Sequence, residues 1–147
     1  MTFHGLETAL AEAIAGRDEG GIPIGAVLQI DGEIVGRGHN QRVQRRSPIL
    51  HAEIDALENA GRLSAGDYRR STIYTTLSPC IMCSGAILLY QIPTVVVGEN
   101  RTFVGAEDRL RAHGVTVEII DDRRCVDLMS VFIAEEPGLW HEDIGEE

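Results

Sequence analysis

The sequence predicts an α/β domain in which helices cover both faces of a β-sheet. Runs of β-branched and aromatic residues alternate along the chain with segments of helical periodicity, an order typical of three-layer α/β/α domains. The length of 147 residues suits one domain, because it is enough to bury a core and too little for two ordinary domains. We therefore expect a single domain over residues 1–147 with one functional site.

The N-terminal part is predicted to form a helix and then a β-hairpin. The helix follows from apolar residues that recur at i, i+3 and i+4 spacing and stop at Gly16: Phe3, Leu6, Leu10, Ala13 and Ile14. The strand-like runs 24–30 and 33–38 flank Asp31-Gly32, a pair typical of two-residue hairpin turns. The second strand should therefore end at His39-Asn40.

Two further helices are predicted to begin at residues whose side chains can bind a metal ion. One covers about 51–60, and the other begins at Cys80, directly after a proline, and continues to Tyr90. A buried strand over 71–77 precedes the second helix. Helix N-termini present unpaired N–H groups and a positive dipole end, so both would lower the pKa of a nearby thiol.

The C-terminal half continues the alternation. We expect a strand over 93–97, a helix over 103–113, a strand over 115–120 and a helix capped by Asp121-Asp122. The last helix has a periodic apolar face: Val126, Met129, Phe132 and Ile133. Residues 136–147 hold the only tryptophan and show no period that predicts an element.

Two short motifs supply the ligands of a metal site. Cys80 and Cys83 are spaced so that one tetrahedral ion can take both thiolates, and His51 offers a nitrogen upstream. A structural zinc site closes with a fourth Cys or His, whereas three protein ligands leave a position for water, the mark of a catalytic site. Glu53 is then available as a base, and we expect one Zn²⁺ per chain.

Each motif alone permits a plainer interpretation. Cys80 and Cys83 could form a redox pair or half of a zinc ribbon, although the sequence has no second Cys-x-x-Cys. His51 could be an ordinary helix-start residue, and Glu53 a surface charge favoured near a helix N-terminus. A redox pair needs no His-x-Glu, so the combination favours the catalytic zinc site.

Charge and hydropathy argue against nucleic-acid and membrane partners. The net charge is −10, and the 13 basic residues are all arginines in short clusters such as 42–46, interpreted as solvated loop charges. Polynucleotide-binding proteins usually present a basic patch. No apolar run approaches the ~20 residues that cross a bilayer, and the start lacks a signal-peptide pattern. Two of the three cysteines are predicted metal ligands, and Cys125 is expected to be a buried apolar residue, so the cysteines do not form a disulfide framework. This suits a reducing compartment, and we expect a cytoplasmic protein.

Segments outside the metal motifs are as distinctive as the motifs: Gly21–Gly25, Gly36–Asn40, Leu57–Leu63, Tyr74–Cys80, Val97–Asn100 and Trp140–Gly145. With them the sequence resembles the cytidine deaminase superfold, and more closely the fungal zinc-dependent cytosine deaminases, along nearly the whole chain. The His-x-Glu and Pro-Cys-x-x-Cys pair itself is shared by zinc deaminases of several substrates. The resemblance implies a five-stranded mixed sheet, a homodimer, and a free nucleobase as substrate, with cytosine converted to uracil and ammonia.

The resemblance also implies roles for single residues. It makes His51, Cys80 and Cys83 the zinc ligands and Glu53 the proton shuttle. The implied substrate-binding residues are Asn40, Ala52, Ser78, Phe103, Trp140 and Asp143, with residues 136–147 as a C-terminal lid. Plainer roles stay open: Asn40 could cap a turn, Asp143 could be a solvated tail charge, and the two aromatic residues could be ordinary packing.

Three other functions remain open. Val43 stands where the fungal enzymes have an aromatic residue, and a wider pocket could take another aminated ring such as guanine, isocytosine or an aminotriazine. Residues 79–86 also resemble tRNA adenosine deaminases, although the acidic charge argues against an RNA substrate. A zinc-stabilised binding module without activity is the third, but such a module would not require Glu53.

Overall fold

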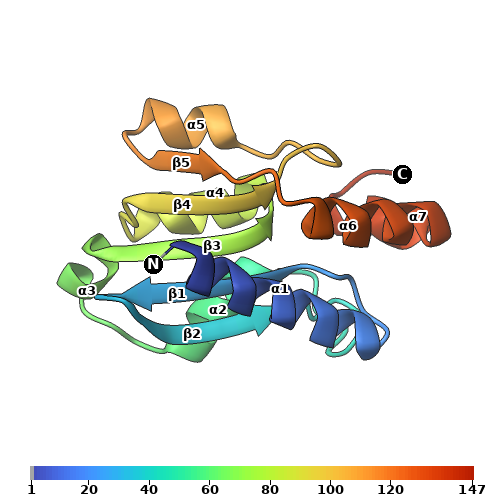
Figure 1. Cartoon of the computed structure of the whole chain (residues 1–147), viewed down its shortest axis with the longest axis horizontal. Coiled ribbons are helices and arrows are strands. Elements are labelled where there is room, and N and C mark those ends of the chain that lie inside the picture. Colours follow the sequence, from blue (N-terminus) through green and yellow to red (C-terminus); the bar gives the residue numbers. More distant parts are fainter. Residues whose placement is uncertain (1) are drawn as a thin grey trace.

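The computed structural model describes residues 2–147 and contains one five-stranded sheet with helices on both faces (Figure 1). In chain order the elements are α1 Thr2–Asp18, β1 Gly25–Ile30, β2 Glu33–His39, α2 Ala52–Ala60, α3 Ala65–Arg69, β3 Ser71–Leu77, α4 Ile81–Leu89, β4 Thr94–Glu99, α5 Glu107–Ala112, β5 Thr116–Ile119, α6 Arg123–Glu135 and α7 Pro137–Asp143. The predicted α/β/α arrangement is confirmed. The side chain of Phe3, part of the predicted helical face, lies outside the described part of the chain.

The sheet is mixed and brings one end of each of its five strands to the same edge. Its order is β2-β1-β3-β4-β5, with β1 antiparallel to both neighbours and β3, β4 and β5 mutually parallel. The carboxyl ends of β2, β3, β4 and β5 and the start of β1 therefore lie on the side from which α6 and α7 extend (Figure 1). That edge carries the candidate site.

Side chains that alternate along the strands build a core on each face of the sheet. On one face, Val27, Tyr74 and Val96 pack together with apolar residues of α1. On the other, Leu28 and Ile73 belong to a cluster that includes residues of α4 and α5. Both faces of the sheet are thus covered by helices. No helix within residues 2–147 is long and apolar enough to span a membrane.

The predicted hairpin between β1 and β2 is confirmed. Asp31 and Gly32 both have positive φ, 52° and 81°, as a two-residue turn between twisted strands requires. Farther along β2, a Cβ at Gly36 would lie 2.4 Å from the carbonyl oxygen of Ala56. This close approach of strand and helix positions the N-terminus of α2 at the edge where β2 ends.

The helices differ from the prediction in both extent and number. The first helix continues past Gly16 to Asp18, and α3 and α7 were not predicted at all. Helix α3 begins at a capping box in which Ser64 and Asp67 bond each other's main chain. Helix α7 has Pro137 in its first turn, a favoured position for proline and the local signal for this helix.

The helix predicted over 103–113 begins only at Glu107. The buried carboxylate of Glu99 accepts hydrogen bonds from the main-chain N–H groups of Arg101 and Thr102, at 2.7 and 2.9 Å. These bonds turn the chain after β4 before a helix can form. Phe103 consequently lies on a loop, residues 100–106, beside the edge that carries the site.

Candidate active site

The predicted metal ligands come together where α2 and α4 begin. His51 and Cys80 are the residues immediately before these helices, so the prediction placed each helix start one residue too early. Both residues have extended main-chain conformations, and neither side chain caps its helix. Both side chains are thus available to each other, and Cys80 Sγ lies 3.5 Å from His51 Nδ1.

The three predicted ligands fit a single zinc ion. The ligand atoms of His51, Cys80 and Cys83 all lie within 4.8 Å of one another, the only such group in the described part of the chain. Ligand atoms around tetrahedral zinc stand roughly 3.5–3.8 Å apart, given the usual Zn–S and Zn–N bond lengths. One imidazole and two thiolates are also a typical zinc donor set. The predicted site for one zinc ion is confirmed.

Hydrogen bonds among the ligands set their protonation in the absence of a metal. The bond with Cys83, and to a lesser extent that with His51, lowers the pKa of Cys80 to about 4. The bond with Cys80, aided by burial, raises the pKa of Cys83 well above its usual range. Burial opposes the charge of His51, but bonds with Asp143 and Cys80 raise its pKa to about 10. Metal binding must therefore release protons.

Asp143 orients the histidine ligand from behind. Its Oδ1 lies 3.3 Å from His51 Nε2, while Nδ1 of the same ring faces the cysteines. A carboxylate on the second ring nitrogen commonly fixes the tautomer and orientation of a metal-bound histidine. Burial opposes the charge of Asp143, but hydrogen bonds from His51, Arg42 and Asn40 lower its pKa. The carboxylate is therefore ionised at neutral pH.

Glu53 is a buried carboxylate next to the zinc group. It lies in the first turn of α2 and lines the same cavity as His51 and Cys80. Burial raises the pKa of Glu53 to about 7. A carboxyl group with such a pKa can both accept and donate a proton near neutral pH.

A small cavity lies beside these groups. Its volume is about 20 Å³. The lining residues are Ile24, His51, Glu53, Leu77, Ser78, Cys80, Phe103, Trp140, Asp143 and Ile144. Ile24, Leu77 and Ile144 were not among the predicted site residues. The strand patterns placed the first two at strand ends, but only the sheet topology shows that these ends share an edge.

Two of the predicted polar contacts are engaged within the protein. Asn40 is fully buried, and its Nδ2 donates to both Asp143 oxygens at 3.1 and 3.3 Å. Its Oδ1 also accepts the N–H of Arg42, so Asn40 does cap a turn. The Ser78 hydroxyl donates to Glu107 at 2.5 Å and accepts the N–H of Gly105. The main-chain N–H of Ser78 donates to the Glu99 carbonyl at 3.0 Å, so the main-chain carbonyl is the Ser78 group left to accept from a substrate.

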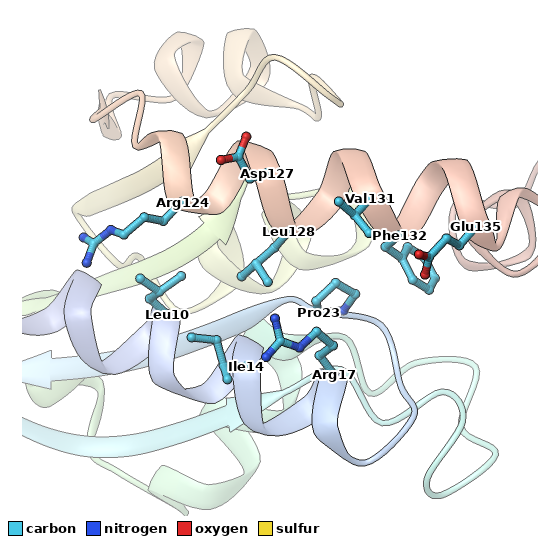
Figure 2. Close-up of a pocket in the computed structure, with 10 residues that line it drawn as sticks. All are labelled: Leu10, Ile14, Arg17, Pro23, Arg124, Asp127, Leu128, Val131, Phe132 and Glu135. Carbon is cyan, nitrogen blue, oxygen red and sulfur yellow. The ribbon is translucent and has the colours of Figure 1, made fainter.

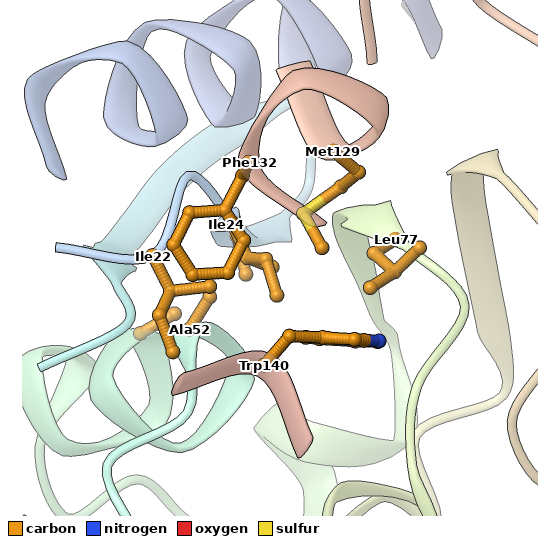
Figure 3. Close-up of a cluster of buried hydrophobic side chains, with 9 residues drawn as sticks. Ile22, Ile24, Ala52, Leu77, Met129, Phe132 and Trp140 are labelled. Carbon is orange, nitrogen blue, oxygen red and sulfur yellow. The ribbon is translucent and has the colours of Figure 1, made fainter. Parts of the chain in front are cut away.

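The predicted aromatic pair is assembled over the cavity. Phe103 and Trp140 meet edge to face, with ring centroids 5.6 Å apart and planes at 88°. Trp140 also packs in the apolar cluster with Phe132 and Leu77 (Figure 3). Ala52 belongs to this cluster as well, and its side chain is absent from the cavity lining. Packing and a role in the site are thus compatible for the aromatic residues.

Arg42 corrects one sequence interpretation. Its side chain is only 16% exposed and its Nε donates to Asp143 Oδ1 at 2.7 Å, so Arg42 is not a solvated loop charge. Arg45 and Arg46 are exposed as expected. Asp143, in turn, is buried and is not a solvated tail charge. The sequence did not predict this ion pair, because local residue spacing does not indicate contacts between residues about a hundred positions apart.

Val43 lies outside the cavity at the zinc group. It lines an outer hollow of about 610 Å³ together with residues of the loop after β2 and of α7. The absence of an aromatic side chain at this position therefore does not enlarge the cavity around Glu53. Cys125 is buried as predicted, and burial raises its pKa to about 12.

A separate apolar hollow of about 370 Å³ lies between α1 and α6 (Figure 2). Leu10 and Ile14 of α1 face Leu128 and Val131 of α6 across it. None of the predicted ligands reaches this hollow. The chemistry of the molecule is therefore concentrated at the sheet edge.

Three ligands at two helix N-termini with a buried carboxylate beside them define a catalytic zinc centre, as opposed to a structural one. Residues 4–99 match the cytidine and deoxycytidylate deaminase zinc-binding region. The chain belongs to this family of zinc-binding deaminases.

Individual relatives agree with this assignment. A cytosine deaminase of Candida albicans is 53% identical over 150 residues, covering 99% of this chain and 100% of that protein. A tRNA-specific adenosine deaminase of Streptococcus pyogenes is 38% identical over 143 residues, 88% of each chain.

Two solved structures share the fold. One is from work on A-to-I editing by tRNA:A34 deaminases, with a TM-score of 0.74 and 27% identity over 86% of this chain and 99% of that one. The other is the guanine deaminase of Bacillus subtilis, with a TM-score of 0.58 and 30% identity over 76% and 69% of the two chains.

Proposed function

We propose that this protein catalyses the zinc-dependent hydrolysis of cytosine to uracil and ammonia. The observation that carries the proposal is the buried carboxylate of Glu53 in one cavity with ligands of a three-residue zinc group. The identity of 53% to a cytosine deaminase along 99% of the chain supports cytosine as the substrate. The wider class is hydrolysis of the amino group on a cyclic amidine.

His51, Cys80 and Cys83 would hold the zinc ion. When bound, zinc supplies Lewis acidity that makes water a nucleophile at neutral pH. Asp143 keeps the imidazole of His51 turned so that Nδ1 faces the two sulfur atoms. The uncapped N–H groups at the starts of α2 and α4 add positive potential where negative charge develops on oxygen.

Glu53 carries the protons in this proposal. It accepts a proton from the attacking water while the water oxygen bonds to the ring carbon that bears the amine. It passes this proton to the adjacent ring nitrogen, then accepts the remaining proton of the added hydroxyl group and passes it to the amine. The C–N bond breaks, ammonia leaves, and the carbonyl of uracil forms.

The substrate-binding roles are part of the same proposal. The Asn40 amide would hold the ring edge, the main chain of Ala52 would bind the base carbonyl, and that of Ser78 would accept the amine. Asp143 would bind the amine side, with Phe103 and Trp140 as walls. A neutral planar base needs orientation more than charge matching, and this set supplies it.

Residues 136–147 form the lid of a single catalytic domain over residues 1–147 in this proposal. Helix α7 carries Trp140 and Asp143, and both line the cavity. A ribose attached to the base would meet this lid and leave the Asp143 carboxylate without its partner. Such a loss costs about 1–3 kcal/mol before any clash is counted. Free bases are therefore favoured over nucleosides and polynucleotides.

A substrate panel tests the proposal. Zinc-loaded protein is given cytosine, cytidine, guanine, isocytosine, adenine, an aminotriazine and an adenosine-containing RNA hairpin, and ammonia release is measured. We expect the highest kcat/KM for cytosine, with cytidine lower by about tenfold or more, as loss of one buried contact implies. Equal rates for cytidine, or a preference for another base or for the hairpin, would reject cytosine as the substrate.

We also propose that the protein forms a homodimer through the outer face of α2 and α4. Ile81, Leu89 and Tyr90 are exposed there, beside a hollow of about 570 Å³ lined by Leu57 and other residues of α2 and α4. Contiguous apolar patches on a protein surface commonly mark interfaces. Sedimentation should give twice the chain mass of 16.1 kDa. Leu89→Glu should yield monomers, and Val131→Glu on α6 should not.

A further inference from the structure

The cavity at the zinc group must open before a nucleobase can enter. A volume of about 20 Å³ holds roughly one water molecule, and a six-membered ring is several times larger. Trp140, Asp143 and Ile144 form the wall contributed by the C-terminal segment. Displacement of α7 would remove this wall, so the contacts that hold α7 bear on access to the site.

Two kinds of contact hold α7 in place. Trp140 packs among apolar side chains, including Leu77 of β3 and Phe132 of α6 (Figure 3). At the C-terminal end of the helix, the buried carboxylate of Asp143 makes directed polar contacts. Apolar packing is non-directional, whereas hydrogen bonds depend steeply on geometry. The contacts of Asp143 therefore decide the exact position of the lid.

Three side chains converge on the Asp143 carboxylate. Arg42 Nε donates to Oδ1 at 2.7 Å, Asn40 Nδ2 donates to both oxygens at 3.1 and 3.3 Å, and His51 Nε2 lies 3.3 Å from Oδ1. The arginine contact is the shortest of the three, and it joins full opposite charges. With 16% and 2% of the two side chains exposed, solvent screens this ion pair weakly.

Arg42 itself lies outside the cavity. It lines the outer hollow together with Leu139 and Glu142 of α7, and its Nη2 donates to the Pro48 carbonyl at 3.3 Å. The guanidinium thus joins the loop after β2 to the lid from the solvent side. It reaches the site only through Asp143.

We propose that Arg42 is the positioning residue of the lid: its ion pair with Asp143 holds α7 closed and keeps that carboxylate against Asn40 and His51. Without the guanidinium, a buried carboxylate loses its cation, which favours displacement of α7 towards solvent. The kinetic part of this inference rests on the proposed function, because it treats Asp143 and Asn40 as substrate contacts. Substrate binding should weaken, while turnover of bound substrate depends on Glu53 and changes less.

Trp140 makes the lid directly observable, because it is the only tryptophan in the chain. Its emission maximum and its quenching by acrylamide report how far α7 shields it, with or without turnover. The variants are Arg42→Gln and Arg42→Lys, with Arg45→Gln as the control, since Arg45 is an exposed arginine of the same loop. Zinc content and circular dichroism confirm that each protein is loaded and folded.

We expect Arg42→Gln to shift Trp140 emission to longer wavelength, to increase its quenching, and to raise KM for cytosine about tenfold while kcat changes less than about threefold. Arg42→Lys should lie between Arg42→Gln and the wild type, because an ammonium keeps the charge but not the planar fork that also reaches Pro48. Arg45→Gln should match the wild type. If Arg42→Gln does not fold, Arg42→Lys decides by the same readouts.

A double variant tests whether Arg42 acts through Asp143. If it does, adding Arg42→Gln to Asp143→Asn causes no further increase in Trp140 quenching. Additive effects, or Arg42 variants that match Arg45→Gln in fluorescence and KM, would overturn the inference. If the wild type does not deaminate cytosine but Arg42→Gln still exposes Trp140, the proposed function fails and the lid assignment stands. If cytosine is deaminated and Trp140 does not respond, the lid assignment alone fails.

Discussion

At the scale of single residues, Glu53 should separate metal binding from catalysis. Glu53→Gln keeps the shape of the side chain but cannot carry protons, so we expect zinc to remain bound and the rate of cytosine hydrolysis to fall by about 10²-fold or more. Metal analysis and initial rates measure the two effects. Glu58→Gln is the matched control, because Glu58 is an exposed glutamate of the same helix. A Glu53→Gln variant that kept more than about a tenth of the activity would refute the proton-carrier role.

Cys80 should link metal content to stability. Cys80→Ser removes a thiolate from the zinc group, so we expect it to lose zinc and to unfold at lower temperature, because metal-binding energy is also folding energy. Zinc analysis and thermal unfolding measure both.

Wild-type protein stripped of zinc by a chelator shows whether the loss of stability in Cys80→Ser comes from the loss of the metal. Metal-stripped wild type and Cys80→Ser should unfold at similar temperatures. Cys125→Ala serves as the control, since Cys125 is buried elsewhere and should keep its zinc. Unchanged zinc in Cys80→Ser would contradict the ligand assignment.

At the scale of elements, the loop over residues 100–106 depends on a buried carboxylate at the start of α5. Glu107 accepts the Ser78 hydroxyl at 2.5 Å and the Asn100 amide at 3.2 Å. A Cβ at Gly105 would lie 1.9 Å from the Pro79 carbonyl oxygen, so the loop rests directly on the residue before Cys80. Glu107 thereby ties the loop that carries Phe103 to the start of α4.

Glu107→Gln should loosen this loop. An amide replaces one acceptor oxygen by an NH₂ group, so one of the two donors loses its partner, at a cost of about 1–3 kcal/mol in the free energy of unfolding. Urea denaturation measures the loss, and KM for cytosine should rise with it. Asp108→Asn, an exposed change on the same helix, is the control. Equal unfolding midpoints for the two variants would show that Glu107 does not support the loop.

At the scale of the whole molecule, His39 joins the end of β2 to the end of α1. Its Nδ1 lies 2.8 Å from Glu12 and its Nε2 lies 2.8 Å from Glu19. Glu12 also pairs with Arg37, and Asp55 of α2 accepts the main-chain N–H of His39. Burial opposes the charge of His39, but the bonds with the two glutamates raise its pKa above the ordinary value.

A raised pKa fixes the sign of the pH effect. The stabilisation from protonated His39 is complete below the unfolded-state pKa of about 6.5 and disappears as the pH rises through the folded-state pKa. The urea midpoint of the wild type should therefore exceed that of His39→Gln most at acidic pH, and the difference should shrink as the pH rises. His113→Gln, at an exposed histidine, is the control. A difference independent of pH would contradict this assignment.

Sequence alone was sufficient where signals are local. The Asp31-Gly32 turn, the buried run of β3 and the Asp122 cap of α6 lie within a few residues of the elements they predict, and all three appear in the structure. The zinc group was equally accessible, because the spacing of Cys80 and Cys83 is set by one helix turn. Backbone propensity and side-chain chemistry act at these short separations.

The tertiary structure decided what depends on burial and on partners distant in sequence. Arg42 and Asp143 are 101 positions apart, and only packing of α7 against the loop after β2 makes them an ion pair. The same holds for residues 100–106, where the burial of Glu99 and Glu107 overrides a helical pattern. Desolvation and charge pairing depend on where the whole chain places a group, so spacing in the sequence could reveal the zinc ligands and could not reveal what holds the lid over them.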